Sequence, residues 1–62
     1  MSSLKENIQR YAKEKNMPIY KLEDEINVAK GSISKWDSVR PSIDKVKAVA
    51  DALGKTIEQL LE

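Results

Sequence analysis

Residues 30–38, KGSISKWDS, place two lysines and three serines around one tryptophan. An ammonium group such as that of Lys35 can donate to guanine O6 and N7 or to a phosphate oxygen, and a serine hydroxyl can donate or accept. The chemistry that this segment can perform is therefore recognition, by hydrogen bonding, of a polyanion or of the edges of bases.

The rest of the chain offers little support for catalysis. It contains no histidine and no cysteine, so the commonest general base and the thiolate ligands of metals are both missing. The carboxylates of Glu23, Asp24 and Glu25 are consecutive, and on a helix they fan outward instead of converging. We therefore expect no enzymatic activity, no metal and no cofactor.

Positive charge is concentrated in one part of the chain. Residues 28–47 hold five basic side chains against two acidic ones, a net charge of +3, whereas the remaining residues sum to −2 and the whole chain to +1. Local positive potential favours binding to DNA, although such charges are also found on ordinary solvated surfaces.

The length of 62 residues allows one domain at most, without a separate sensor domain. No apolar run is long enough to span a membrane, and the first ten residues lack the apolar core of a signal peptide. We expect a cytoplasmic protein that has no membrane association and no small-molecule effector.

Five helices and no strand fit the residue pattern. Capping residues predict where helices begin: Ser3 with Glu6, Ser42 with Asp44, and Thr56 with Gln59. Helix ends and turns are predicted at Asn16, Asn27, Pro41 and Gly54, whereas Pro18 is tolerated in the first turn of the second helix. The expected helices therefore cover roughly residues 3–16, 18–26, 30–38, 42–54 and 56–61.

Apolar residues recur at helical spacing within these segments. The first helix is expected to bury Leu4, Ile8, Tyr11 and Ala12, and the fourth to bury Ile43, Val46, Val49, Ala50 and Leu53. Between these helices, the apolar residues have the spacing of two short helices joined by a tight turn; they are Leu22, Ile26, Val28, Ile33 and Trp36. Asn27 is expected in the turn with a positive φ. At about 100° per residue, Ala29 joins Ile33 and Trp36 on the buried side of the second helix. This is the apolar skeleton of a helix-turn-helix, whose second helix lies in the major groove of DNA.

The segment LEDEINVAKGSISKW, residues 22–36, resembles the DNA-binding domain of the Xre/Cro-type phage repressors. The stretches PSIDKVKAVADALG and TIEQLL are similar to the later helices of that domain, so the resemblance covers essentially the full chain. It implies an all-α, compact five-helix lambda-repressor-like fold as a single domain over residues 1–62. Its helix-turn-helix would be formed by helices 2 and 3, with the recognition helix at about residues 30–38.

The chain departs from the family pattern at four positions. Glu23 stands where these motifs usually have Ala, so its carboxylate is expected to turn to the edge of the helix contact or to loosen the packing. Asn27 replaces the usual turn Gly. Ala29 replaces the usual Ser or Thr cap, so the third helix is expected to begin without a side-chain cap, at a cost of about 1 kcal/mol. Ala12 replaces an Arg that pairs with an acid after the recognition helix, which leaves Asp37 without that partner.

The resemblance and the helical geometry together assign candidate contacts to DNA. Base contacts are expected from Lys30, Gly31, Ser32, Ser34 and Lys35. Phosphate contacts are expected from Ile19, Tyr20, Lys21, Ser38, Arg40, Ser42 and Ile43. The alternatives are a phosphate contact for Lys30, a solvated surface role for Lys35 and Arg40, a capping role for Ser38 through water, and simple tolerance of Gly31 in a helix. Trp36 and Tyr11 are assigned to the core.

These features predict a small sequence-specific DNA-binding transcriptional regulator of repressor or Cro type, bound to double-stranded DNA as a homodimer. The last helix is the expected dimer surface, because Leu60 and Leu61 point in different directions and we do not expect both to be fully buried. The alternative is a protein-interaction module of the same fold, such as an antitoxin or an adaptor that binds a protein partner.

Overall fold

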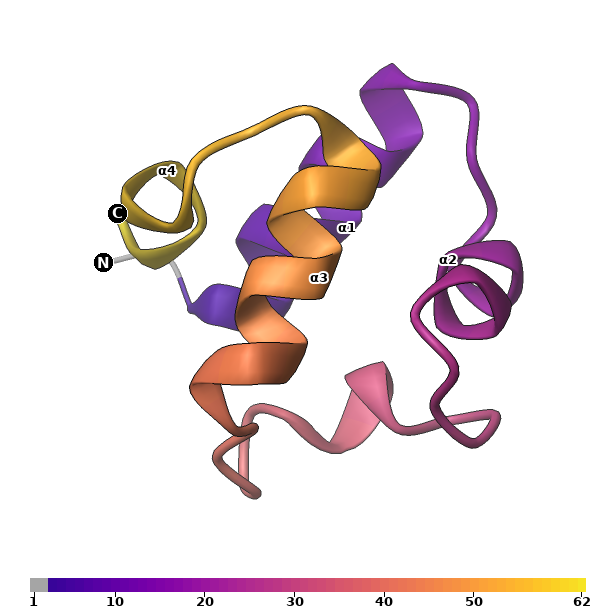
Figure 1. Ribbon diagram of the computed structural model, residues 1–62, viewed down its shortest axis with the longest axis vertical. Coiled ribbons are helices and arrows are strands. Elements are labelled where there is room, and N and C mark those ends of the chain that lie inside the picture. Colours follow the sequence, from indigo (N-terminus) through magenta and orange to yellow (C-terminus); the bar gives the residue numbers. More distant parts are fainter. Residues whose placement is uncertain (1–2) are drawn as a thin grey trace.

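Four α-helices and one short 3₁₀ turn make up the secondary structure of residues 3–62, the part of the chain that the computed structural model describes. They are α1 (Leu4–Glu14), α2 (Ile19–Glu25), the 3₁₀ turn η1 (Ile33–Lys35), α3 (Ile43–Leu53) and α4 (Ile57–Leu61). Figure 1 shows α1 and α3 side by side, with α4 against both at one side and α2 against both at the other. The described residues are all-helical as expected, but the expected count of five helices is wrong, because residues 30–38 form turns around η1. None of the helices in this part of the chain has the length and apolar character needed to cross a lipid bilayer.

Polar side chains and left-handed residues define the ends of the helices. Hydroxyl caps that accept the amide hydrogen three residues further on are found, as predicted, at Ser3, Ser42 and Thr56. Gln59 completes the predicted capping box of α4. Asn16 and Asn27 have φ values of 55° and 65°, and Gly54 ends α3 with a φ of 70°. The predicted helix ends at Asn16 and Gly54 and the predicted turn at Asn27 are therefore confirmed.

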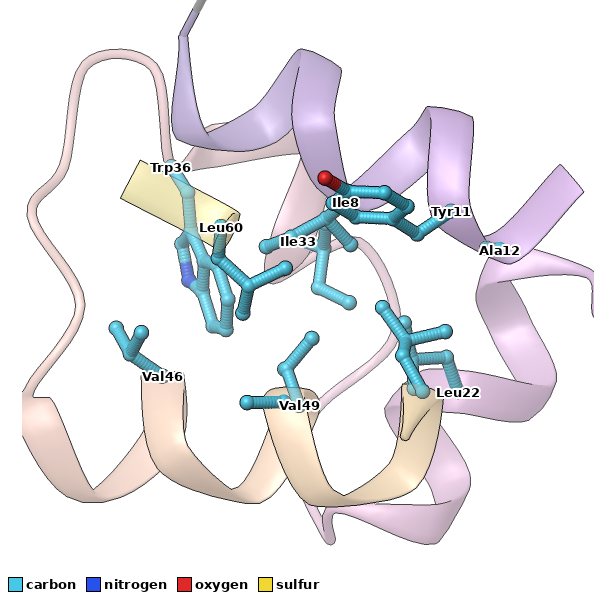
Figure 2. Close-up of a cluster of buried hydrophobic side chains, with 11 residues drawn as sticks. Ile8, Tyr11, Ala12, Leu22, Ile33, Trp36, Val46, Val49 and Leu60 are labelled. Carbon is cyan, nitrogen blue, oxygen red and sulfur yellow. The ribbon is translucent and has the colours of Figure 1, made fainter. Parts of the chain in front are cut away.

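One hydrophobic cluster joins all the elements of the described chain. Its buried members are Ile8, Tyr11, Ala12, Leu22, Ile33, Trp36, Val46, Val49, Ala50, Leu53 and Leu60. Figure 2 shows the side chains of Ile33 and Trp36 pointing into the space between α1 and α3. The assignment of Trp36 and Tyr11 to the core is therefore confirmed. Burying an aliphatic side chain of this kind contributes roughly 1.5–3 kcal/mol, so this cluster is the main source of stability in a small chain.

The predicted apolar faces are wrong at two positions. Ile43 is 62% exposed, because it is the first residue of α3 and lines an open groove instead of meeting another helix. Ala29 is also exposed, because it lies in the link between α2 and η1 and not on a helix. In α4, Leu60 is fully buried and Leu61 is 58% exposed, so these neighbours do point in different directions.

Candidate nucleic-acid interface

The segment that links α2 to α3 forms a series of tight turns. Figure 1 shows it along one edge of the molecule, from the end of α2 through η1 to the start of α3. The amides of residues 32, 35, 36 and 38 each donate to the carbonyl three residues earlier at 3.1 Å, which is the 3₁₀ pattern. Gly31 has a φ of +85°, outside any right-handed helix. The prediction of an α-helix over residues 30–38, with Gly31 inside it, is therefore wrong.

The residue types of this segment explain why no α-helix forms. Glycine is a poor helix former, and serine and aspartate compete with helical hydrogen bonds through their own side chains. The Ser34 hydroxyl donates to the Gly31 carbonyl at 2.7 Å, and the Ser38 hydroxyl donates to the Lys35 carbonyl at 3.3 Å. Local bonds of this kind offer the backbone an alternative to the helical ladder. Ser38 therefore binds a carbonyl directly, whereas the capping role left open by the sequence was one through water.

Glu23, on α2, holds the start of the segment. Its side chain is only 3% exposed, so the expectation that its carboxylate turns to an edge is wrong. Both carboxylate oxygens accept the amide hydrogen of Gly31 at 3.1 Å, and Oε2 also accepts that of Ile33 at 3.1 Å. The turn has no cap from a neighbouring side chain, as expected from Ala29, but the carboxylate of Glu23 on α2 accepts its first amide hydrogens instead. Sequence reasoning missed it because local caps are sought within a few residues, and Gly31 is 8 positions away.

Ile33 and Trp36 determine which side of the segment faces outward. Their side chains are 0% and 8% exposed and belong to the core. Among the candidate base contacts, the exposed residues are Lys30, Ser34 and Lys35, and the half-buried ones are Gly31 and Ser32. The segment is thus anchored by its apolar side chains and carries its basic and hydroxyl side chains on the outside.

A helix, a tight turn at Asn27 and a second helical turn anchored on the core form the geometry of this region. A family model of the Cro/C1-type HTH DNA-binding domain matches residues 7–62. The chain belongs to this family. This Cro/C1-type chain is therefore a helix-turn-helix DNA-binding domain, and the resemblance found in its sequence is confirmed. A search among curated proteins found no match.

The Cro/C1-type domain carries its candidate phosphate contacts on both sides of η1 along the chain. At the start of α2, Tyr20 and Lys21 are exposed and Ile19 is half-buried. The candidates between η1 and the first turn of α3 are all exposed; they are Ser38, Arg40, Ser42 and Ile43. The hydroxyl oxygen of Ser42 accepts the Lys45 amide hydrogen at 3.4 Å, a bond that does not use the hydroxyl proton. The contacts of these residues with DNA stay predictions.

An exposed ion pair joins this region of the Cro/C1-type domain to α1. The Lys5 Nζ atom lies 3.5 Å from Asp37 Oδ2, and the two side chains are 26% and 53% exposed. Lys5, in the first turn of α1, thus supplies the partner that Ala12 cannot supply to Asp37. The two residues are 32 positions apart, so no spacing in the sequence relates them.

Proposed function

We propose that this Cro/C1-type domain is a small sequence-specific transcriptional regulator of repressor or Cro type, a cytoplasmic protein without catalytic activity. Residues 30–38 lie in the major groove of double-stranded DNA in this proposal. The observation that carries it is the burial of Ile33 and Trp36 on one side of the segment, with Lys30 and Lys35 exposed. The net charge of +3 over residues 28–47 supports it, because DNA binding depends on local positive potential.

The hydrogen bonds within the segment refine the proposed reading of bases. Lys30 and Lys35 are the donors, and guanine O6 and N7 are the acceptors that suit them. The Ser34 hydroxyl already donates to the Gly31 carbonyl, so its oxygen is left to accept. Cytosine N4 and adenine N6 are the donors in the major groove that such an oxygen can meet. Gly31 and Ser32 are half-buried; we assign Gly31 a close approach of its backbone to the groove, because it has no side chain, and Ser32 a hydroxyl that can donate or accept.

Phosphate contacts would set the orientation of the domain on the duplex without reading its sequence. Tyr20 and Lys21 would approach one strand from the start of α2. Arg40 and Ser42 would approach the backbone on the other side of the segment. The two amino-terminal helix ends favour anions at these places, because their first amides have no partner within the helix.

We further propose that two copies bind together on a near-palindromic site, with their reading segments one turn of DNA apart. An open groove of about 750 Å³ beside η1 supports a contact between copies. It is lined by Val39, Ile43 and Leu61, which are 57%, 62% and 58% exposed.

Fluorescence anisotropy tests the DNA-binding proposal, with a duplex selected from a random library and a scrambled duplex of equal length. The logarithm of affinity should fall linearly with the logarithm of salt concentration, with a slope near −0.9 for each phosphate contact. Lys30→Ala/Lys35→Ala should abolish the preference for the selected duplex. Lys13→Ala/Lys15→Ala, at the end of α1, removes the same charge and should keep the preference. Equal effects of the two double variants would reject residues 30–38 as the reading segment.

A protein-binding role, as an antitoxin or an adaptor, is the second candidate function. The observation that favours it is the same groove, because exposed apolar side chains gathered in one place suit a protein partner. This function predicts a tight complex with another protein and only weak DNA binding that salt abolishes. The anisotropy titration separates the two candidates, since only a regulator prefers one duplex over its scrambled version.

A further inference from the structure

Glu23 holds the turn of the helix-turn-helix at both of its ends. Its main-chain carbonyl accepts the amide hydrogen of Val28 at 3.0 Å, just after the turn residue. Its carboxylate accepts the amide hydrogens of Gly31 and Ile33 at 3.1 Å each. One residue of α2 therefore fixes the path of the chain from the end of that helix to the first residue of η1.

The amides of Gly31 and Ile33 point at one carboxylate because Gly31 has a φ of +85°. Nearby amides that converge in this way on one point form a concave site for an anion, of the kind that binds phosphate in other proteins. Here the anion is supplied by the chain itself and is buried. Neither amide is then a donor to the phosphates of DNA, although both belong to the segment that we place in the groove.

We propose that Glu23 is a positioning residue for DNA recognition, whose carboxylate fills the anion site formed by the Gly31 and Ile33 amides and so fixes the presentation of Lys30 and Lys35. This inference rests on the proposed function. Local capping does not do this work, because Ala29 has no side-chain oxygen and the Ser32 side chain makes no capping bond. Ile33 anchors the other side of the same turn in the core, so the segment is held from both sides.

Electrostatics and positioning predict opposite outcomes when the charge of Glu23 is removed. A carboxylate close to a polyanion opposes binding, so Glu23→Gln would strengthen DNA binding if charge alone mattered. Positioning predicts the reverse for a specific site. The glutamine amide offers one oxygen where the carboxylate offers two, and its NH₂ group faces backbone amides that are also donors.

The experiment compares Glu23→Gln with Asp24→Asn, a matched control that removes the same charge from an exposed neighbour on α2. Anisotropy is measured on the selected and the scrambled duplex at several salt concentrations. Glu23→Gln should weaken binding to the selected duplex about 10-fold or more, as expected for a lost charged hydrogen-bond acceptor, and leave binding to the scrambled duplex equal or stronger. Asp24→Asn should leave both equal or slightly stronger. Glu23→Gln behaving like Asp24→Asn on the selected duplex would overturn the proposal.

Amide hydrogen exchange followed by NMR provides a readout that needs no DNA and that already tests the contact in the wild-type protein. The amides of Gly31 and Ile33 should exchange slowly in the wild-type protein, since both are bonded to a buried carboxylate. In Glu23→Gln their exchange should accelerate, while the amides of Val49 and Leu53 in α3 should still exchange slowly.

The wild-type protein alone can overturn the proposal, even if Glu23→Gln fails to fold. This would follow if the amides of Gly31 and Ile33 exchanged as fast as unprotected amides in water. Slow exchange in a protein that prefers no duplex would refute the proposed function and leave the contact of Glu23 intact.

Discussion

The side-chain amide of Asn7, on α1, donates a hydrogen bond of 2.8 Å to the main-chain oxygen of Leu60, which lies 53 positions further along the chain. The same Nδ2 atom donates to the main-chain oxygen of Glu62 at 3.1 Å. Asn7 is only 1% exposed, and the oxygens that it binds belong to the end of α4, where a helix leaves carbonyls without partners. A helix of only five residues is thereby fastened to α1.

Replacing Asn7 with Asp should destabilise the protein by about 1–3 kcal/mol or more. An ionised carboxylate has no proton to donate, and it would be buried against two carbonyl oxygens. Urea denaturation followed by circular dichroism measures the change in the free energy of unfolding. The control is Asn16→Asp, an exposed position where the side chain has no comparable role, and it should change stability much less. Equal stability of Asn7→Asp and the wild type would contradict the importance of this contact.

Gly31 is required for its backbone conformation and not for lack of space. A Cβ atom at this position would meet only the Ser34 Oγ atom, at 3.9 Å, an ordinary contact. Gly31→Ala should nevertheless cost about 1–2 kcal/mol, because its φ of +85° is unfavourable for a residue with a Cβ atom. Gly31→Asn should cost less, because asparagine tolerates positive φ values. The free energies of unfolding of the two variants in urea decide the matter, and equal losses would point to a steric cause.

The ion pair between Lys5 and Asp37 should contribute little to stability. Both side chains are partly exposed and the pair is 3.5 Å apart, a geometry that typically yields less than about 1 kcal/mol. A double-mutant cycle with Lys5→Ala and Asp37→Ala measures the coupling energy, which should shrink further as salt is added. A coupling energy well above about 1 kcal/mol that salt does not change would show that the pair stabilises the fold by more than an exposed ion pair can.

The groove that Val39, Ile43 and Leu61 line should mediate contact between copies of the chain. Leu61→Ser replaces an exposed apolar side chain of α4 and should shift the self-association equilibrium toward single copies. The matched control is Tyr20→Ser, because Tyr20, at 62%, is about as exposed as Leu61 but lies at the start of α2, outside the groove. Analytical ultracentrifugation over a range of concentrations measures the mass. A single-copy mass for the wild type well above micromolar concentration would refute this surface for the free protein.

The amino-acid sequence by itself determined the features that depend on residues close to one another. The caps at Ser3, Ser42 and Thr56 and the positive φ values at Asn16 and Asn27 follow from local hydrogen bonding and sterics. The burial of Ile33 and Trp36 was also predictable, even though the helix type was not. Residues three apart lie on one side in both an α-helix and a 3₁₀ turn, so the spacing holds for either. Ala29 lies four residues before Ile33, a spacing that serves only the α-helix, and there the prediction failed.

The tertiary structure alone decided which distant groups meet. The carboxylate of Glu23 reaches amides 8 and 10 positions away, and Lys5 reaches Asp37 across 32 positions. Neither contact follows a helical or turn period, because each depends on how α1 and α2 pack around the shared core. The conformation of residues 30–38 was likewise decided by the tertiary structure. Weak helix formers leave that segment without a strong local preference, so the buried anchors and the carboxylate of α2 select the tight turns that it adopts.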